Sequence, residues 1–326
     1  MAEVPAGARG QRRLTGIWAV GWWALLCGAL ALSPGARAGV IGAPAATAST
    51  REATPLARRQ VLHRALRADT SQHYLLYVPG AGGVGAPVVV ATHGISRNVG
   101  EHASLFAPYA EKHGAVLVAP FFPPGEFDDY QRLGREGHGR RSDLALEAIV
   151  REVAELTGAD ASKIRVFGFS GGAQFAHRYT LAHPDRVAAA AVAAAGWYTF
   201  PDTATPYPYG LGTGDEPSSV RFEPDKFLRV PITVFVGTAD TGSKNVRRNP
   251  SVDRQQGVTR LERAQRWTAA MRRAAESRGL PALVTCELVP GVGHSFRQFM
   301  EEGDAGERVF EALLESHHAA ATGGRP

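Results

Sequence analysis

One pentapeptide, Gly168 to Gly172 with the sequence Gly-Phe-Ser-Gly-Gly, constrains this chain more than any other segment. It follows a short apolar run, Ile164 to Phe167, and it precedes a helical segment that begins at Ala173. The order is therefore strand, sharp turn and helix, with Ser170 at the turn. Glycines flank a serine in this way where the turn is strained and the strand and helix pass too close for a Cβ atom. The serine then projects beyond the end of a sheet, and the helix N-terminus behind it favours developing negative charge.

Two further candidate residues follow Ser170 along the chain. Asp240 comes after the apolar run 231–237, and His294 comes after the run 283–288, in a glycine-rich turn. Each of the three residues lies just past the carboxyl end of a predicted strand. Open α/β sheets place their sites at that edge, so the three side chains are expected to meet there.

The N-terminus has the pattern of an export signal. Two arginines precede an apolar stretch from Ile17 to Leu32, and the small-residue pattern Ala36-x-Ala38 follows it. We expect residues 1–38 to be a signal peptide that is cut after Ala38, with an uncleaved signal anchor as the alternative. The arginine pair leaves both the Sec and the twin-arginine export routes open.

Loss of this segment changes the charge balance. The segment carries four arginines and one glutamate, so the remaining chain has 32 basic and 30 acidic residues. No basic stripe is interleaved with aromatic residues, and we expect no nucleic-acid partner. Cys286 is then the single remaining cysteine, which excludes an intrachain disulfide. We expect a secreted or periplasmic bacterial protein with no membrane span in its mature form.

A fourth segment lies upstream of the pentapeptide. Val88 to Thr92 is a predicted buried strand that runs into His93 and Gly94. With this His-Gly segment, the serine pentapeptide and the order serine, aspartate, histidine, the sequence resembles the α/β-hydrolase superfamily over about residues 73–316. The His-Gly segment, the pentapeptide and the export signal also resemble secreted esterases of the polyhydroxyalkanoate depolymerase and feruloyl esterase kind.

The resemblance implies a role for each candidate side chain. Ser170 would be the nucleophile, His294 the general base that takes its proton, and Asp240 the acid that orients the imidazole. Asp253, downstream in another polar loop, is the alternative acid. We prefer Asp240 because the acid of this fold lies within a few residues of its strand, although an Asx turn is its other possible role.

The same resemblance implies an oxyanion hole made of backbone. Its donors would be the N–H groups of Ile95 and Gly171, one after the early strand and the other directly after the nucleophile. His93 is expected to orient the turn that carries Ile95.

Strands alternate with helices along the chain, as a parallel sheet with crossover connections requires. The fold class expected is α/β, with the α/β-hydrolase fold: a mostly parallel central sheet with helices on both faces. We expect residues 39–72 to form a loose N-terminal extension, 73–318 the single catalytic domain and 319–326 a tail. The predicted strands span 74–78, 87–92, 115–119, 164–167, 187–195, 231–237 and 283–288, and the predicted helices span 101–112, 142–156 (capped by Ser142) and 173–183.

Two loops are long for this fold and rich in proline and aromatic residues, 120–130 and 196–229. Both leave the carboxyl edge of the predicted sheet. Trp197 and Tyr198 directly follow a strand, and we predict that they bind substrate as walls of the pocket. The alternative is that the loops cover the sheet edge and bury their own aromatic rings.

The residues together predict an exported serine hydrolase that cleaves carboxylic esters, small or polymeric, through an acyl-enzyme. No cofactor and no metal site are expected, since the adjacent carboxylates Asp128 and Asp129 have no further ligands nearby in sequence. The same residues could cleave amides, peptides or a polyanionic amide polymer. A non-catalytic binding protein on the same fold is the alternative from another class.

Overall fold

The structure is a computed structural model that describes residues 56–135, 137–214, 216–217, 219–243 and 246–315. The predicted signal peptide, its cleavage site after Ala38 and the predicted tail at 319–326 lie outside the described residues. Among the residues described, no helix is long and apolar enough to cross a membrane.

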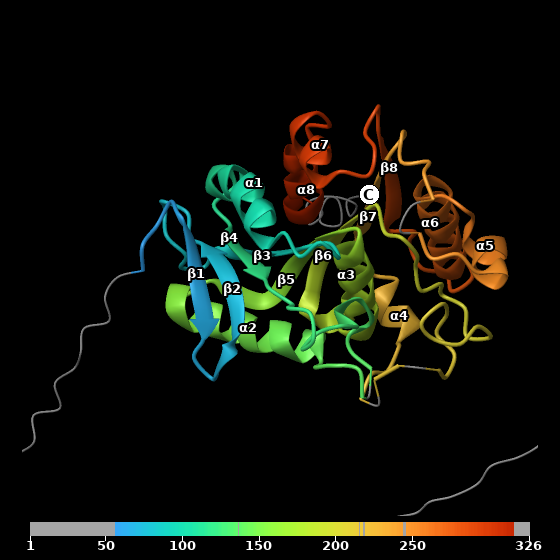
Figure 1. Cartoon of the computed structure of the whole chain (residues 1–326), viewed down its shortest axis with the longest axis horizontal. Coiled ribbons are helices and arrows are strands. Elements are labelled where there is room, and N and C mark those ends of the chain that lie inside the picture. Colours follow the sequence, from blue (N-terminus) through green and yellow to red (C-terminus); the bar gives the residue numbers. More distant parts are fainter. Residues whose placement is uncertain (1–55, 136, 215, 218, 244–245, 316–326) are drawn as a thin grey trace, which may run out of the picture. The chain divides into compact units, whose positions relative to one another are not determined.

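A single eight-stranded sheet organises the described part of the chain, with strand order β1-β2-β4-β3-β5-β6-β7-β8 (Figure 1). β1 and β2 are antiparallel to each other, and β2 is antiparallel to β4. From β4 through β3 to β8 all pairs are parallel, so the carboxyl ends of these strands meet at one edge. The strands are β1 (Val61–Leu66), β2 (Asp69–Tyr77), β3 (Pro87–Thr92), β4 (Val116–Pro120), β5 (Asp160–Phe169), β6 (Val187–Ala193), β7 (Ile232–Gly237) and β8 (Val284–Val289).

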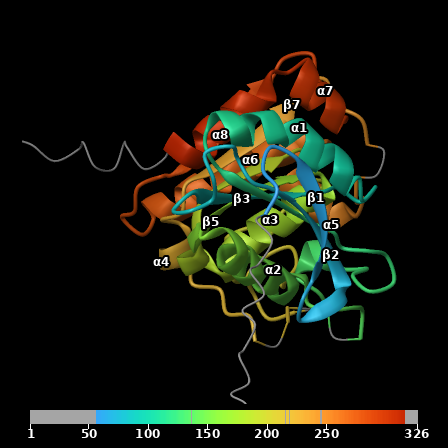
Figure 2. The same ribbon diagram turned by 90° about the vertical axis from the view of Figure 1, so that its left-hand side faces the viewer.

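Helices cover both faces of this sheet, as Figure 2 shows for α1 and α8 on one side and α2 on the other. One apolar core lies between the strands and α2, α3 and α6, and a second lies between the strands and α1, α7 and α8. All seven residues of β6 are buried, as expected for a strand with a helical layer on each face. The helices are α1 (Val99–Lys112), α2 (Ser142–Thr157), α3 (Gly171–Ala182), α4 (Pro224–Phe227), α5 (Pro250–Gln256), α6 (Arg260–Glu276), α7 (Phe296–Glu301) and α8 (Ala305–Leu314), with 3₁₀ turns η1 (Tyr130–Arg132) and η2 (Pro184–Arg186).

The predicted alternation of strands and helices is confirmed, and each predicted strand and helix overlaps one in the structure. The predicted boundary at residue 73 is wrong, because β1 and the start of β2 belong to the sheet. The sequence did not predict β1. It is an edge strand whose residues are mostly half-buried, and this weakens the apolar pattern of the strand. Ser142 does not cap α2; its hydroxyl donates to the Tyr130 carbonyl at 2.8 Å, and Arg141 precedes the helix.

Candidate active site

The pentapeptide forms a tight turn between β5 and α3. Ser170 has φ 55° and ψ −111°, a left-handed conformation that an L-residue adopts only under constraint. A Cβ atom on Gly168 would lie 2.1 Å from the Gly172 carbonyl oxygen, and one on Gly172 would lie 2.1 Å from that of Thr92. Close approach of backbone to backbone therefore explains both flanking glycines.

The structure brings Ser170, His294 and Asp240 together from three different strand ends. Nε2 of His294 lies 3.0 Å from the Ser170 hydroxyl, and Nδ1 lies 2.8 Å from Oδ2 of Asp240. Because the carboxylate only accepts, the proton belongs on Nδ1, which leaves Nε2 to accept the serine proton. The imidazole also stacks on the ring of Phe169, with centroids 5.2 Å apart.

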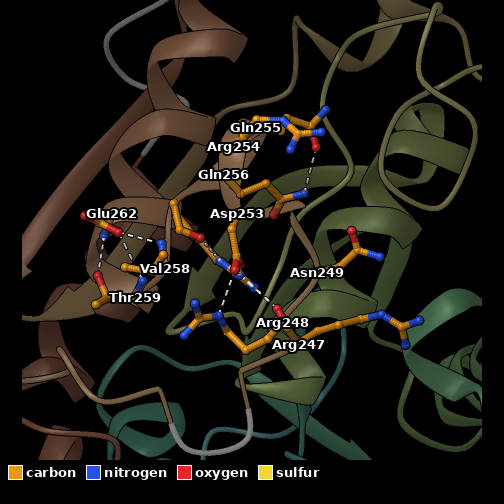
Figure 3. A network of polar contacts seen from close by, with 12 residues as sticks. Arg247, Arg248, Asn249, Asp253, Arg254, Gln255, Gln256, Val258, Thr259 and Glu262 are labelled. Atoms are coloured by element: carbon orange, nitrogen blue, oxygen red, sulfur yellow. Dashed lines mark hydrogen bonds and ion pairs between the residues drawn. The ribbon is translucent and has the colours of Figure 1, made fainter. Parts of the chain in front are cut away.

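The two candidate acids have different surroundings. Asp240 is buried, and its second oxygen, Oδ1, accepts a hydrogen bond of 3.2 Å from Nη1 of Arg260. Asp253 is in α5 and accepts a hydrogen bond of 2.8 Å from Arg248 (Figure 3). It accepts a second bond, also of 2.8 Å, from Arg263. His294 therefore hydrogen-bonds to Asp240, whereas Asp253 belongs to a separate ion-pair network with Arg248 and Arg263.

The backbone amides of Ile95 and Gly171 are close neighbours. A Cβ atom on Gly171 would lie 3.1 Å from the Ile95 nitrogen, and Gly171 is the first residue of α3. At the first residue of a helix, the backbone N–H has no acceptor inside the helix. Two such amides at a helix N-terminus can bind a developing oxyanion.

His93 holds the turn that carries Ile95, as predicted. Its Nδ1–H donates to the Gly94 carbonyl at 2.9 Å, and Nε2 accepts the Phe122 N–H at 3.1 Å. Burial lowers the pKa of His93 to about 4, so the ring is neutral and uses both nitrogens structurally. The Tyr130 hydroxyl adds a third contact, donating to the His93 carbonyl at 3.0 Å.

A cleft of about 300 Å³ opens beside Ser170 and His294. The turn after β3, the first turns of α1, the end of β5 and the start of α7 line it. Ile95 presents an exposed apolar side chain there, and Phe296 stacks on His102 with ring centroids 3.7 Å apart. Arg297 at the rim pairs with Glu101 at 3.0 Å, so the cleft combines apolar side chains with polar and charged ones.

Two solved structures share this architecture at 27% sequence identity. The first is poly(aspartic acid) hydrolase-1 from Sphingomonas sp. KT-1, with a TM-score of 0.62 over 74% of this chain and 92% of that chain. The second is a poly(3-hydroxybutyrate) depolymerase from Bordetella parapertussis, with a TM-score of 0.62 over 77% of this chain and 89% of that chain. A ferulic acid esterase is similar in fold alone, at 16% identity and a TM-score of 0.52, over 78% of this chain and 98% of that chain. No protein-family model matches the sequence, and no curated protein does.

This chain has the α/β-hydrolase fold. The strand order, the turn at Ser170 and these structural similarities agree on it, and they support a hydrolase.

The structure does not bring Trp197 and Tyr198 of this α/β-hydrolase to the cleft, contrary to the prediction. Trp197 is 5% exposed. The guanidinium carbon of Arg178 lies over its indole ring, 4.0 Å from the ring centroid. Tyr198 is fully buried and stacks on Trp267 at 4.8 Å. The loop after β6 turns inward over α3 and α6, so its aromatic rings fill the interior, as in the alternative interpretation of these loops.

The loop after β4 behaves in the same way. Phe122, Phe127 and Tyr130 are buried and pack against one another, with ring centroids 5.3 Å apart in two of the pairs. Arg97 ties this loop to the turn after β3, since its Nε donates to the Phe122 carbonyl at 2.8 Å.

Sequence reasoning missed Arg260, which contacts the buried oxygen of Asp240. The only signal in its vicinity is the pair Thr259 and Glu262, a capping box that marks the start of α6. That signal places a helix start but does not tell which arginine of the helix faces the acid.

The acidic pair Asp128 and Asp129 is not part of a metal site in the described residues. In the part of the chain that the structure describes, no three His, Cys, Asp or Glu side chains are arranged to bind a metal ion. Asp128 accepts the Gly125 N–H and Asp129 pairs with Arg135, so both carboxylates serve the loop after β4.

Proposed function

We propose that this α/β-hydrolase is an exported serine hydrolase that cleaves carboxylic esters through an acyl-enzyme. The observation that carries the proposal is the hydrogen-bonded chain from Ser170 through His294 to Asp240, which opens on the cleft. An unreactive serine would not need a strained turn, an imidazole within hydrogen-bond distance and a buried carboxylate behind that imidazole.

Acylation begins when Ser170 Oγ attacks the carbonyl carbon of the ester. His294 Nε2 takes the hydroxyl proton, and the carbonyl oxygen becomes an oxyanion that accepts from the N–H groups of Ile95 and Gly171. The C–O bond to the alcohol then breaks, and the imidazolium returns its proton to the leaving alkoxide. The acid part of the substrate remains as an ester of Ser170.

Deacylation repeats these steps with water as the nucleophile. His294 takes a proton from water, the hydroxide attacks the acyl carbon, and the tetrahedral intermediate collapses to release the acid. The proton returns to Ser170 Oγ. The whole cycle consumes one water and needs no redox partner.

The cleft and the similar proteins support an ester with an apolar acid part. Ile95, Phe169 and Phe296 supply apolar contact surface next to Ser170. One similar protein is a poly(3-hydroxybutyrate) depolymerase, which favours a polyester. The other is a poly(aspartic acid) hydrolase at the same identity, which favours a polyanionic amide polymer as the second candidate.

Labelling with a fluorophosphonate probe tests the catalytic proposal. We expect the protein that begins at Gly39 to be labelled and Ser170→Ala to remain unlabelled while keeping the same thermal unfolding curve. Loss of the serine of a triad lowers kcat by about 10⁶. An unlabelled parent protein would favour a non-catalytic binding protein on this fold.

A substrate panel then separates the two candidates. Nitrophenyl esters of increasing acyl length, solid polyhydroxybutyrate and soluble poly(aspartic acid) are compared by kcat/KM, with Ser170→Ala as the blank. Faster cleavage of poly(aspartic acid) than of any ester would replace the ester proposal with the amide one.

Export is tested separately by the intact mass of protein from the periplasm and the medium. We expect a chain that begins at Gly39, after cleavage at Ala38. If only full-length protein is found, and only in the membrane fraction, the N-terminal segment is an uncleaved signal anchor and not a cleaved signal peptide.

A further inference from the structure

Arg260 is the partner of Asp240 on the side away from the histidine. Its Nη1 donates to Oδ1 of Asp240 at 3.2 Å, while Oδ2 accepts from Nδ1 of His294 at 2.8 Å. The side chains of Arg260 and Asp240 are 2% and 1% exposed, so solvent does not screen the pair. A cation, a carboxylate and an imidazole are therefore aligned, with the carboxylate in the middle.

The start of α6 fixes the position of Arg260. Thr259 caps the helix, and Glu262 closes a capping box with it by accepting the Thr259 and Val258 N–H groups (Figure 3). Arg260 is the first residue of the helix, directly after the cap. Its backbone is thus anchored from both sides, and its side chain reaches the interior at Asp240.

Several other titratable groups lie around Arg260, Asp240 and His294. On the cleft side of His294, Arg297 and Glu101 pair with each other at 3.0 Å. Tyr198, from the loop after β6, lies near both Asp240 and Arg260, and burial raises its pKa, so it is neutral. Arg263, one turn farther along α6, is paired with Asp253. Burial lowers the pKa of Arg260, and the Asp240 carboxylate opposes that change.

A cation at this position has two physical consequences. It balances the charge of a carboxylate that solvent does not screen. Its positive charge also opposes the addition of a proton to the nearby imidazole, because like charges repel. Both consequences act in the same direction, so removal of the cation makes proton uptake by the pair easier.

We propose that Arg260 is a positioning residue that fixes the Asp240 carboxylate and sets the pH below which the pair of Asp240 and His294 becomes protonated and inactive. The inference rests on the proposed function for its catalytic readout. The inference adds Arg260 as a fourth side chain to Ser170, His294 and Asp240. Arg260 acts through Asp240 and does not contact the substrate.

The chain offers a matched control one turn away on the same helix. Arg263 is equally buried, and it donates to the Gly196, Gly257 and Arg247 carbonyls and to the Asp253 carboxylate. Its carboxylate partner does not contact His294. A variant of Arg263 therefore loses a buried arginine and an ion pair without changing the charge on the triad.

The experiment compares Arg260→Gln, Arg260→Lys and Arg263→Gln with the parent. Glutamine keeps a donor for Asp240 and removes the charge, whereas lysine keeps the charge and removes the planar guanidinium. The pH dependence of fluorophosphonate labelling gives the acidic limb of reactivity. The NMR titration of the His294 ring, assigned with His294→Asn, gives the same proton uptake without any reaction.

We expect Arg260→Gln to move the acidic limb and the His294 titration midpoint to higher pH by about 1 unit or more, as for loss of a charge within a few ångströms. Arg260→Lys should keep the limb in place and lower the labelling rate by about 10-fold or more, since small misplacements of catalytic groups are that costly. Arg263→Gln should lower the unfolding temperature and leave the limb unchanged.

Three results would overturn the proposal: no shift in Arg260→Gln, an equal shift in Arg263→Gln, or parent-like reactivity of Arg260→Lys. If Arg260→Gln does not fold, the lysine variant alone decides, because a structural role predicts neither a lower rate nor a fixed limb in a stable protein. A parent protein that the probe does not label would refute the proposed function, and the His294 titration would still test Arg260.

Discussion

The serine side and the acid side of the site are built in different ways, although they meet at one histidine. The serine side consists of β3, β5 and α3, where backbone packs against backbone: the Gly172 Cβ position lies 2.1 Å from the Thr92 carbonyl oxygen. The acid side consists of the loop after β7 and the start of α6, where long side chains make the contacts, as Arg260 does with Asp240.

The difference concerns both geometry and charge. Backbone contacts form the serine turn, and the buried His93 next to it is uncharged. Side-chain ion pairs give the acid side formal charges in a buried place, so its behaviour depends on charge and pH. We expect changes at the glycines of the serine turn to act on folding, and changes at Asp240 and Arg260 to act on reactivity.

On the acid side, the largest effect on kcat is expected when Asp240 is changed. Asp240→Asn should lower kcat by about 10⁴ without unfolding the protein, because the amide no longer fixes the imidazole tautomer. Asp253→Asn should leave kcat nearly unchanged and lower the unfolding temperature, because it breaks the pair with buried Arg263. Steady-state kinetics with a nitrophenyl ester and thermal unfolding measure both; the reverse pattern would assign the acid role to Asp253.

A large effect on stability is expected from Gly172→Ala. The added Cβ would meet the Thr92 and His93 carbonyl oxygens at 2.1 and 2.6 Å, and backbone on both sides cannot give way. Such overpacking should lower the free energy of unfolding by about 3 kcal/mol or more.

Gly100→Ala is the matched control for this change, because nothing lies within 4 Å of its Cβ position in α1. It should be neutral or stabilising by about 0.5 to 1 kcal/mol in urea unfolding. A stable, active Gly172→Ala would show that the turn does not depend on close packing.

Acid should destabilise the protein through its buried histidines. Burial lowers the pKa of His93 to about 4 and that of His102 to about 3, so the unfolded chain binds protons before the folded one does. Their contribution to stability is therefore complete above about pH 6.5 and is lost as the pH falls. His93 alone should account for about 3 kcal/mol between its unfolded and folded pKa values.

Urea unfolding between pH 7.5 and 4.5 measures this loss. His93→Asn should be less stable than the parent at neutral pH, because it gives up two hydrogen bonds, and its stability should fall less steeply with acid. Equal slopes in the two proteins would contradict a neutral buried His93.

The smallest effect is expected at the cleft wall. Ile95→Ala should raise KM for long-chain esters by about 3- to 10-fold with little change in kcat, because a few apolar carbons leave the contact surface while the backbone N–H remains. Trp197→Phe should leave KM unchanged on every ester, since that ring lies in the interior. A raised KM in Trp197→Phe would restore the predicted role of Trp197 in binding substrate.

Much of the fold was predictable because its signals are local. The apolar runs that became β3, β6 and β7 are short and bounded by turn residues, and parallel strands covered on both faces read as continuous apolar runs. The edge strand β1 and the helix α6 were not predicted, since one is half exposed and the other is mostly polar in sequence.

The sequence by itself determined the serine turn, the chain order of Ser170, Asp240 and His294, and the sheet edge at which they meet. These features depend on glycines and on short strands, and both can be recognised from a few consecutive residues of the sequence. Only the tertiary structure decided that Arg260 faces Asp240 and that Trp197 and Tyr198 lie inside. Those outcomes depend on how a loop and a helix that are far apart in sequence pack over the sheet. The sequence around an arginine or an aromatic residue does not show whether its side chain faces the core or the cleft.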